Sequence, residues 1–353
     1  MSRLFTRERS GFELSSTHLE AHRHPLVKRP FNSSGTLLLR LACRSVATWL
    51  VFTAVVASGK NVCFAVIGDY GNDSEAESRV AAMVQAWRPD FILTVGDNAY
   101  DEQTSQQDAF QKDVVAYYSN YIVRSSWDPY ARRTRFFPSL GNHDYKYSGP
   151  GVDLLAAYES AFAVPPGPGG HHYYEFARGP VRFFALDSNK DEYPVWWPAQ
   201  KRWLDTAIRR AGERWKIVFF HHSPYHSGST HWNETHMRRF NFERLGVTAV
   251  LAGHEHVYER VMHKRVPFIT NGLGGHSVYE FREQLVSGSA MHYPAVYPKS
   301  PTKMRNTFGA LFVEASDRAI TVEFWNLGGE KIDDWYWPPL SNPPLSRTPA
   351  AQP

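Results

Sequence analysis

The sequence predicts an α/β fold of the α+β kind, in which two mixed β-sheets pack together and helices flank them. Three observations predict it. Short apolar strands recur along most of the chain, amphipathic helical stretches follow several of them, and the last strands follow one another directly. A hydrophobic share of 42% in 353 residues is ordinary for a protein that buries a core. With no internal repeat in view, we expect one folded domain over residues 60–337.

The first 59 residues are organised differently from this domain. Arg40 and Arg44 precede an apolar run, Val46–Ala57, and small residues follow it. This is the pattern of a secretory signal peptide, and the run is shorter than the roughly 20 residues of a membrane span. We expect a secreted or periplasmic protein with no stable membrane span after processing. An uncleaved membrane anchor and a disordered cytosolic tail are the alternatives.

The composition limits which kinds of metal site and which partners are possible. Of the two cysteines, Cys43 lies in the N-terminal segment and Cys63 in the domain, which excludes a disulfide framework and a cysteine zinc site there. A metal must therefore be held by histidine, carboxylate, amide or phenolate groups. The net charge of +4 arises largely before residue 50, so we expect no nucleic-acid partner. Residues 338–353 are rich in proline and predict a disordered tail.

The elements follow in order from residue 62. Apolar strands are predicted over residues 62–69, 91–97 and 135–142, with a helix over 77–87 after the first. A strand over 181–187 precedes an amphipathic helix over 199–211. Further strands are predicted over 215–222, 246–254, 266–272, 309–315 and 319–326, the last two with the spacing of a hairpin.

Five short motifs place polar side chains at the ends of these strands. They are Gly68-Asp69-Tyr70-Gly71, Gly96-Asp97-Asn98-Ala99-Tyr100, Gly141-Asn142-His143-Asp144, Val218-Phe219-Phe220-His221 and Gly253-His254-Glu255-His256. In open α/β sheets, ligands bind at the carboxyl ends of the strands, and glycines let the chain turn sharply there. One such motif alone is often a turn or a helix cap. All five in this order predict a dinuclear metal site.

The set resembles the motifs of the calcineurin-like metallophosphoesterases and, within them, of the purple acid phosphatases of the small single-domain type. Gly71 stands where many other metallophosphoesterases have histidine, and Tyr100 follows Asp97 by three residues. The stretch GHEHVYER, which ends at Arg260, is also similar to the plant enzymes beyond its metal ligands. The resemblance covers residues 62–330 and implies a four-layer αββα sandwich.

The resemblance also implies a ligand set. Asp69, Tyr100 and His256 would bind the first metal, Asp97 would bridge both, and Asn142, His221 and His254 would bind the second. It implies Fe(III) in the first site and Zn(II), Mn(II) or Fe(II) in the second. Hard trivalent iron prefers carboxylate and phenolate oxygen, whereas a softer divalent ion accepts imidazole and amide groups.

Some roles stay open. His221 and His222 are adjacent, and neighbours on a strand point to opposite faces, so only one is expected to bind the metal. The spacing from Val218 favours His221. The resemblance gives His143 and His231 roles as substrate-side histidines, with His226 as the rival of His231, and Asp144 is expected to orient His143. We interpret Asp187 as structural.

The implied activity is that of an acid phosphatase, which hydrolyses small phosphomonoesters by attack of a metal-bound hydroxide. A phosphodiesterase acting on nucleotides or phospholipid head groups is the alternative, because the same centre serves both reactions. A binding or regulatory pseudo-enzyme would be expected to lack a ligand, and none of the seven is missing. The sequence does not indicate an oligomeric state.

Overall fold

The computed structural model of the chain describes residues 61–100, 109–122, 134–146, 156–189 and 197–338. The predicted N-terminal segment and the predicted tail after residue 338 lie outside these ranges. All described residues belong to one compact unit, Val56–Pro353. Within the described ranges, no helix is long and apolar enough to cross a lipid bilayer.

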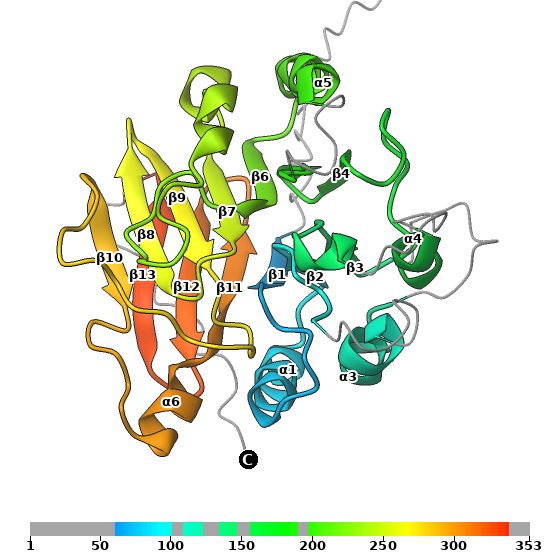
Figure 1. Cartoon of the computed structure of the whole chain (residues 1–353). Helices are drawn as coiled ribbons and strands as arrows, with labels where there is room; N and C mark the ends of the chain where they lie inside the picture. The colour runs from blue at the N-terminus through cyan, green and yellow to red at the C-terminus, as the bar shows by residue number, and fades with distance from the viewer. Residues whose placement is uncertain (1–60, 101–108, 123–133, 147–155, 190–196, 339–353) are drawn as a thin grey trace, which may run out of the picture. The chain divides into compact units, whose positions relative to one another are not determined.

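One sheet has six strands and carries the beginning and the end of the described chain (Figure 1). The strands are β1 (Val62–Ile67), β2 (Phe91–Thr94), β3 (Phe136–Pro138), β11 (Gly309–Ala315), β12 (Ile320–Asn326) and β13 (Lys331–Trp337). Their order is β13-β12-β11-β1-β2-β3. Because β1 pairs in parallel with β2 and β2 with β3, the carboxyl ends of these three strands meet at one edge.

The second sheet has seven strands in the order β10-β8-β9-β7-β6-β5-β4. They are β4 (Tyr174–Arg178), β5 (Val181–Ala185), β6 (Trp215–His222), β7 (Ala249–Gly253), β8 (Tyr258–His263), β9 (Val266–Asn271) and β10 (Ser289–Tyr293). Parallel pairing joins β5 to β6, β6 to β7 and β7 to β9. The sheet is therefore mixed, and β6 and β7 end at the same edge.

Aromatic side chains fill the space between the two sheets. Phe64 on β1 stacks on Phe91 at 5.0 Å between ring centroids and meets Phe183 of the second sheet edge-on at 5.2 Å. Phe91 in turn contacts Phe176 at 5.9 Å, again across the sheets. All four side chains are buried. Such ring pairs add to the burial of apolar area that holds the sandwich together.

A polar contact also joins the two sheets. The Arg260 guanidinium on β8 donates two hydrogen bonds, of 2.7 and 2.8 Å, to Asp333 on β13, and the Tyr258 hydroxyl donates a third at 2.7 Å. Glu259 lies between them in sequence and points to the other face, where it accepts bonds from Ser227. Tyr258 and Arg260 of β8 therefore face the other sheet, whereas Glu259 faces the loop that contains Ser227.

Helices cover the outer faces of the sheets. They are α1 (Glu75–Trp87), α3 (Ala116–Tyr118), α4 (Ala156–Ala161), α5 (Trp197–Arg210) and α6 (Pro301–Thr307), with a π-helix η1 (Phe110–Val115) and 3₁₀ turns η2 (His143–Tyr145), η3 (His236–Phe240) and η4 (Phe242–Leu245). The Ser74 side chain caps α1 by accepting a bond from the Glu77 amide, and Trp87 of α1 packs on Phe312 of β11. Two mixed sheets with flanking helices confirm the predicted fold class.

The differences from the predicted elements lie in short or polar strands. The strands β4, β8, β10 and β13 were not predicted. β10 is only half-buried, and β13 reads KIDDWYW, with charged residues inside the strand. In β13 the burial of Asp333 follows from its pairing with Arg260, which no local pattern reveals.

Candidate metal centre

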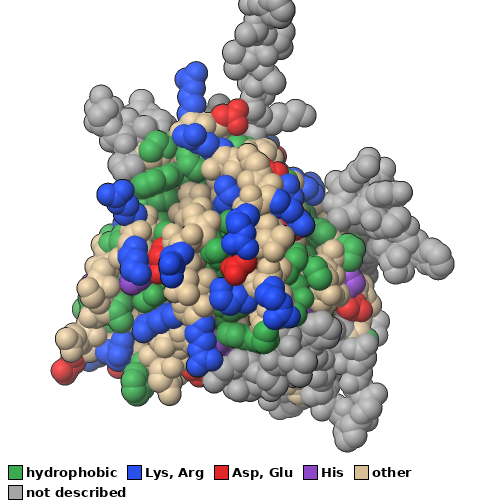
Figure 2. Space-filling model, turned by 90° about the horizontal axis from the view of Figure 1, so that it is seen from above, with side chains coloured by type: hydrophobic (Ala, Val, Ile, Leu, Met, Phe, Trp, Pro, Cys, Tyr) green, Lys and Arg blue, Asp and Glu red, His purple; other side chains and the backbone are tan. Residues whose placement is uncertain are grey.

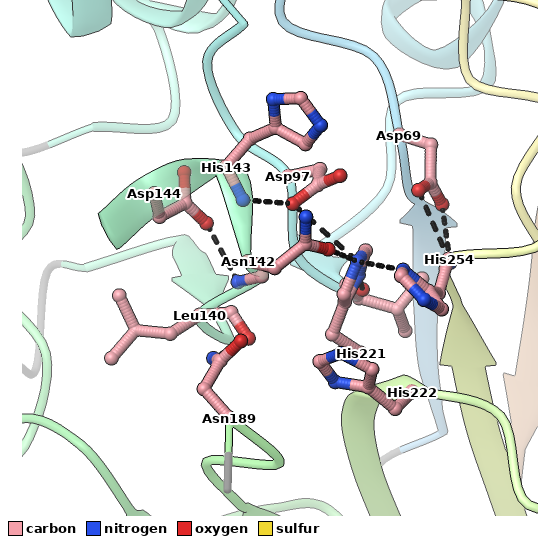
Figure 3. A network of polar contacts seen from close by, with 12 residues as sticks. Asp69, Asp97, Leu140, Asn142, His143, Asp144, Asn189, His221, His222 and His254 are labelled. Carbon is pink, nitrogen blue, oxygen red and sulfur yellow. Dashed lines mark hydrogen bonds and ion pairs between the residues drawn. The ribbon is translucent and has the colours of Figure 1, made fainter. Parts of the chain in front are cut away.

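The five predicted motifs meet at one edge between the sheets. Asp69 follows β1, Asp97 follows β2, Asn142 follows β3, His221 lies at the end of β6, and His254 follows β7. Figure 3 shows these side chains turned toward one another from the ends of their strands. Parallel pairing within each sheet brings them to the same side, although up to 185 residues separate bonded partners such as Asp69 and His254.

The first cluster consists of Asp69, Tyr100 and His256. The Tyr100 hydroxyl lies 3.3 Å from Asp69 Oδ1 and 3.2 Å from His256 Nε2. His256 Nε2 in turn lies 3.3 Å from the same carboxylate oxygen. Three donor atoms, two of them oxygens, thus surround one point.

The second cluster consists of Asn142, His221 and His254. His221 Nε2 lies 3.0 Å from Asn142 Oδ1 and 3.0 Å from His254 Nδ1. One oxygen and two imidazole nitrogens converge here. This donor set is richer in nitrogen than the first.

Asp97 lies between the two clusters. Its Oδ1 is 3.4 Å from His221 Nε2 and accepts a hydrogen bond of 2.9 Å from the His143 amide. Asp69, Asp97 and His221 each offer a ligand atom within 4.8 Å of the other two. The position suits a carboxylate whose oxygens serve two ions.

The backbone at these ligands is held in an uncommon conformation. Asp69, Asp97 and His254 have φ values of 56°, 50° and 71°, in the left-handed region. Such residues cost roughly 1–3 kcal/mol each and persist where the surrounding structure fixes them. At Gly141 a β-carbon would collide with the amide and carboxylate of Asp97, so only glycine lets these two loops approach.

Each imidazole of the centre has a partner on its second nitrogen. His221 Nδ1–H donates to the Val95 carbonyl at 2.8 Å, and His254 Nε2–H donates to the Glu234 carboxylate at 3.0 Å. His256 Nδ1 lies 2.6 Å from Ser277 Oγ. These contacts leave His221 Nε2, His254 Nδ1 and His256 Nε2 facing the cluster, as metal-binding histidines require.

The electrostatics favour bound cations. Asp69 and Asp97 are buried, and no lysine or arginine of the described ranges forms an ion pair with either. Burial opposes ionisation of Asp97, but His221 and His143 outweigh it and hold its pKa below the ordinary value. Burial likewise opposes the charged form of His221, yet Asp97 and Asp69 raise its pKa to about 9. Buried carboxylates of this kind are compensated by cations or metal ions, so the donor set fits two metals.

The Tyr100 hydroxyl can lose its proton and act as a phenolate ligand only if a highly charged cation lies beside it. Burial raises the pKa of Tyr100 well above its ordinary value, and the charges of Asp97 and Asp69 raise it further. The ring is sandwiched between His276, stacked at 3.8 Å, and His143 at 4.3 Å between centroids.

The two adjacent histidines of β6 point to different surroundings. His221 joins the clusters, whereas His222 Nδ1 lies 2.8 Å from the Ser188 hydroxyl. His222 Nε2 is 3.6 Å from Glu234, the same carboxylate that His254 Nε2 contacts at 3.0 Å. Burial, reinforced by His221, lowers the pKa of His222 well below its ordinary value, so its neutral form dominates.

The expected substrate-side residues differ in placement. The ring of His143 lies over Tyr100, at the centre, and is contacted by Lys146 Nζ at 2.9 Å. His231 stacks on His254 at 3.9 Å between centroids. Asp144 is buried and accepts bonds from the Asn98 and Gly141 amides, so it fixes the loop that carries Asn142. Its expected orientation of His143 stays a prediction.

Glu255, inside the Gly-His-Glu-His motif, anchors the loop that carries His231. Its carboxylate accepts bonds from the Thr230 amide at 3.0 Å and the His231 amide at 2.9 Å, and it lies 3.3 Å from His231 Nδ1. Burial opposes the charged form of His231, but Glu255 outweighs it and raises the pKa of His231. His226 lies farther from Glu255, at 3.8 Å, and burial lowers its pKa to about 4.

Several residues that contact the predicted ligands were not predicted from the sequence. Glu234 follows His231 by three residues and Glu255 stands within a motif, so both could have been considered. Ser277, His276 and Tyr279, which stacks on His256 at 4.1 Å, follow β9 and carry no motif of their own. Asp187 binds the Gln200 amide group and Asn189 side chain, in keeping with a structural role.

Comparison with known proteins identifies the family. Residues 63–258, more than half of the chain, match the family described as calcineurin-like phosphoesterase. The chain belongs to the calcineurin-like phosphoesterase family. The predicted resemblance to purple acid phosphatases is likewise confirmed by the relatives.

Two plant relatives illustrate the degree of likeness. Purple acid phosphatase 3 of Arabidopsis thaliana is 25% identical over 304 residues, which cover 78% of this chain and 77% of that protein. Purple acid phosphatase 23 of the same plant is 27% identical over 221 residues, or 56% of this chain and 47% of that protein.

A solved structure supports the fold. Purple acid phosphatase PPD1 from yellow lupin (Lupinus luteus) seeds superposes with a TM-score of 0.56 at 15% identity, over 79% of this chain and 54% of that chain. The chain therefore spans about half the length of Purple acid phosphatase 23 and of the lupin protein.

Proposed function

We propose that this phosphoesterase is a dinuclear-metal acid phosphatase that hydrolyses small phosphomonoesters. The observation that carries the proposal is the convergence of all seven predicted ligands on two clusters that share Asp97. The family supports phosphoester hydrolysis. The names of the plant relatives, purple acid phosphatases, support the choice of an acid phosphatase within that family.

The donor chemistry favours different metals in the two positions. Carboxylate and phenolate oxygen from Asp69 and Tyr100 suit Fe(III), whereas Asn142, His221 and His254 suit Zn(II), Mn(II) or Fe(II). Two such ions would clamp the phosphate group and make water nucleophilic near neutral pH.

The side chains around the centre act on the substrate. The rings of His143 and His231 line the centre, beside Tyr100 and His254 respectively, where each can donate a hydrogen bond to a phosphate oxygen. One of them supplies the proton that the leaving alkoxide takes up, a task for a group with a pKa near the working pH. Glu255 holds His231 in place for this role.

Metal analysis with a visible spectrum tests the metal assignment. We expect iron in the purified protein and a charge-transfer band that disappears in Tyr100→Phe. Tyr279→Phe is the matched control, since Tyr279 stacks on His256 and is expected to leave the band in place. Zinc or manganese without iron, or a band that survives in Tyr100→Phe, contradicts the assignment.

Substrate preference is tested separately. We expect an aryl monophosphate to be hydrolysed faster than the corresponding bis-aryl diester. The opposite order would favour the phosphodiesterase alternative, for which the same donor set is suitable.

We also propose export through the N-terminal segment, supported by the basic flank and apolar run that end at Ala57. N-terminal sequencing of the protein isolated from its source tests this. A new N-terminus shortly after Ala57 is expected, and an intact Met1 in the cytosol contradicts it.

A further inference from the structure

A strongly basic surface covers the outer side of the second sheet. The inner sides of α5, η3 and η4 pack in a buried cluster that includes Leu204, Phe240 and Phe242. Their outer sides and the adjoining turns carry exposed basic residues, among them Arg202, Arg209, Arg214, Arg239, Arg244 and Arg265. Figure 2, which looks down on α5, shows many lysine and arginine side chains on this side and few acidic ones. We call these six arginines the basic face.

The acidic groups near the basic face are already paired with other cations. Asp205 pairs with Lys201, Glu213 with Arg182, and Glu243 with Lys264. By contrast, none of the six arginines forms an ion pair with any residue that the structure describes. Like charges without counter-charges attract an anionic partner at moderate ionic strength.

The metal centre does not account for all of this charge, because Arg214 and Arg265 lie far from it. β6 begins at Trp215, next to Arg214, and carries His221 at its other end. β9 runs parallel to β7, so Arg265, just before β9, lies at the end of β7 opposite to His254. The basic face therefore includes the end of the sheet that is remote from the phosphate-binding site.

The chain enters the folded domain at this same end. Val62, the first residue of β1, pairs with Ala315, and the neighbouring Ser316 carbonyl accepts a bond of 2.7 Å from Trp215 Nε1. The Arg214 guanidinium lies 5.1 Å from the Trp215 ring. In the sequence, the apolar run Val46–Ala57 ends five residues before Val62. Before the proposed cleavage removes it, a run held in a bilayer would keep this end of the domain, and with it the basic face, near the head groups.

We infer that the basic face docks on a membrane surface that contains anionic phospholipids. Arginine guanidinium groups present paired donors that match phosphate oxygens, and each basic residue near such a surface adds to the attraction. Single-stranded nucleic acid would call for exposed aromatic rings on which bases stack. Of the large hydrophobic side chains most exposed in the described ranges, Val296 follows β10 and Trp232 precedes η3. Trp232 is thus a single exposed ring beside the face and not a series of rings on which bases could stack.

Vesicle sedimentation of the full chain tests the inference. Vesicles of phosphatidylcholine alone are compared with vesicles that contain one-quarter phosphatidylserine, at low and high salt. We expect stronger binding to the anionic vesicles, which high salt removes. The variant Arg202→Glu/Arg239→Glu/Arg244→Glu should lower binding to anionic vesicles at least ~tenfold and leave binding to neutral vesicles unchanged.

The matched control is Lys299→Glu/Lys303→Glu/Arg305→Glu, which makes the same change in charge around α6, before the start of β11. It should retain binding to anionic vesicles. Thermal melting followed by circular dichroism establishes that both variants fold. Equal binding of the unaltered chain to the two vesicle types, or equal losses in the two variants, overturns the inference. Binding to duplex DNA with none to anionic vesicles would assign the face to nucleic acid instead.

Discussion

Glu234 shows how a single residue outside the ligand set bears on the metal centre. Its carboxylate accepts the hydrogen bond from His254 Nε2–H, and this bond keeps the lone pair of Nδ1 directed at His221 and the second cluster. The same carboxylate lies near His222. One partly exposed side chain thus fixes the ring orientation of His254, a proposed metal ligand, and also contacts His222.

Removal of Glu234 should weaken binding of the second metal. Glu234→Ala leaves His254 free to rotate and to change tautomer, and we expect about 10- to 100-fold lower affinity for the divalent ion. Titration against a chromophoric chelator measures it. Glu280→Ala, at an exposed glutamate, is the control and should bind metal normally. Unchanged affinity in Glu234→Ala would show that His254 is held by its packing alone.

Glu77 makes stability depend on pH. It is buried at the first turn of α1, where it accepts bonds from the Asn72 and Asp73 amides, and burial raises its pKa to about 9. A raised pKa means that the folded protein keeps the proton which the unfolded chain loses near pH 4.5. The contribution of neutral Glu77 is therefore complete below pH 4.5 and is lost as pH rises toward 9.

Glu77→Gln should remove this dependence. Relative to the variant, the free energy of unfolding of the unaltered chain should fall between pH 4.5 and 9, by at most about 1.4 kcal/mol per pH unit. Urea denaturation at several pH values measures the difference, with Glu75→Gln, exposed in the same turn, as the control. Parallel curves for Glu77→Gln and the unaltered chain would mean that Glu77 is already ionised in the fold.

At the level of elements, the segment from Ser227 to His231 carries one of the two histidines that we propose to act on the substrate. Glu259 of β8 holds its start through Ser227, and Glu255 holds its end through Thr230 and His231. Between these points Gly228 leaves no room for a β-carbon, because Glu255 occupies that space.

Gly228→Ala should therefore displace the segment and His231 with it. We expect kcat/KM for an aryl phosphate to fall at least ~tenfold, since small misplacements of catalytic groups are costly. Gly212→Ala, where a β-carbon meets nothing within 4 Å, is the control and should leave kcat/KM unchanged. Normal activity in Gly228→Ala would place His231 outside the reaction.

The elements also show which features of the fold and the site could be predicted from the sequence. Asp69 and Asp97 could be predicted because each comes just after an apolar strand and directly after a glycine. Ser277 and Tyr279 could not, since they reach His256 only through the path of the chain after β9. Similarly, the predicted strand over residues 62–69 was found as β1, but its place between β11 and β2 depends on pairing with residues some 250 positions away, such as Val62 with Ala315.

In the whole molecule, Phe91 is a central contact between the sheets. Its ring meets Phe64, Phe137, Phe176 and Phe183 at 5.0 to 5.9 Å between centroids. Phe91→Ala should lower the free energy of unfolding by about 3–5 kcal/mol, because it leaves a cavity where the sheets meet. Urea denaturation measures it. Val296→Ala, at a side chain 77% exposed, should change stability by less than ~0.5 kcal/mol, and a similarly small effect at Phe91 would contradict this packing.

The residues Tyr258, Glu259 and Arg260 affect how homologous sequences should be interpreted. Tyr258 and Arg260 tie the sheets together through Asp333, and only Glu259 reaches the segment that carries His231. In this stretch, mutations that affect the packing of the two sheets can therefore be separated from mutations that affect the segment carrying His231. A homologue that kept GHEHVYER but lost Asp69 would keep the contacts that join the sheets while lacking a proposed metal ligand, so this stretch alone would indicate common ancestry and not activity.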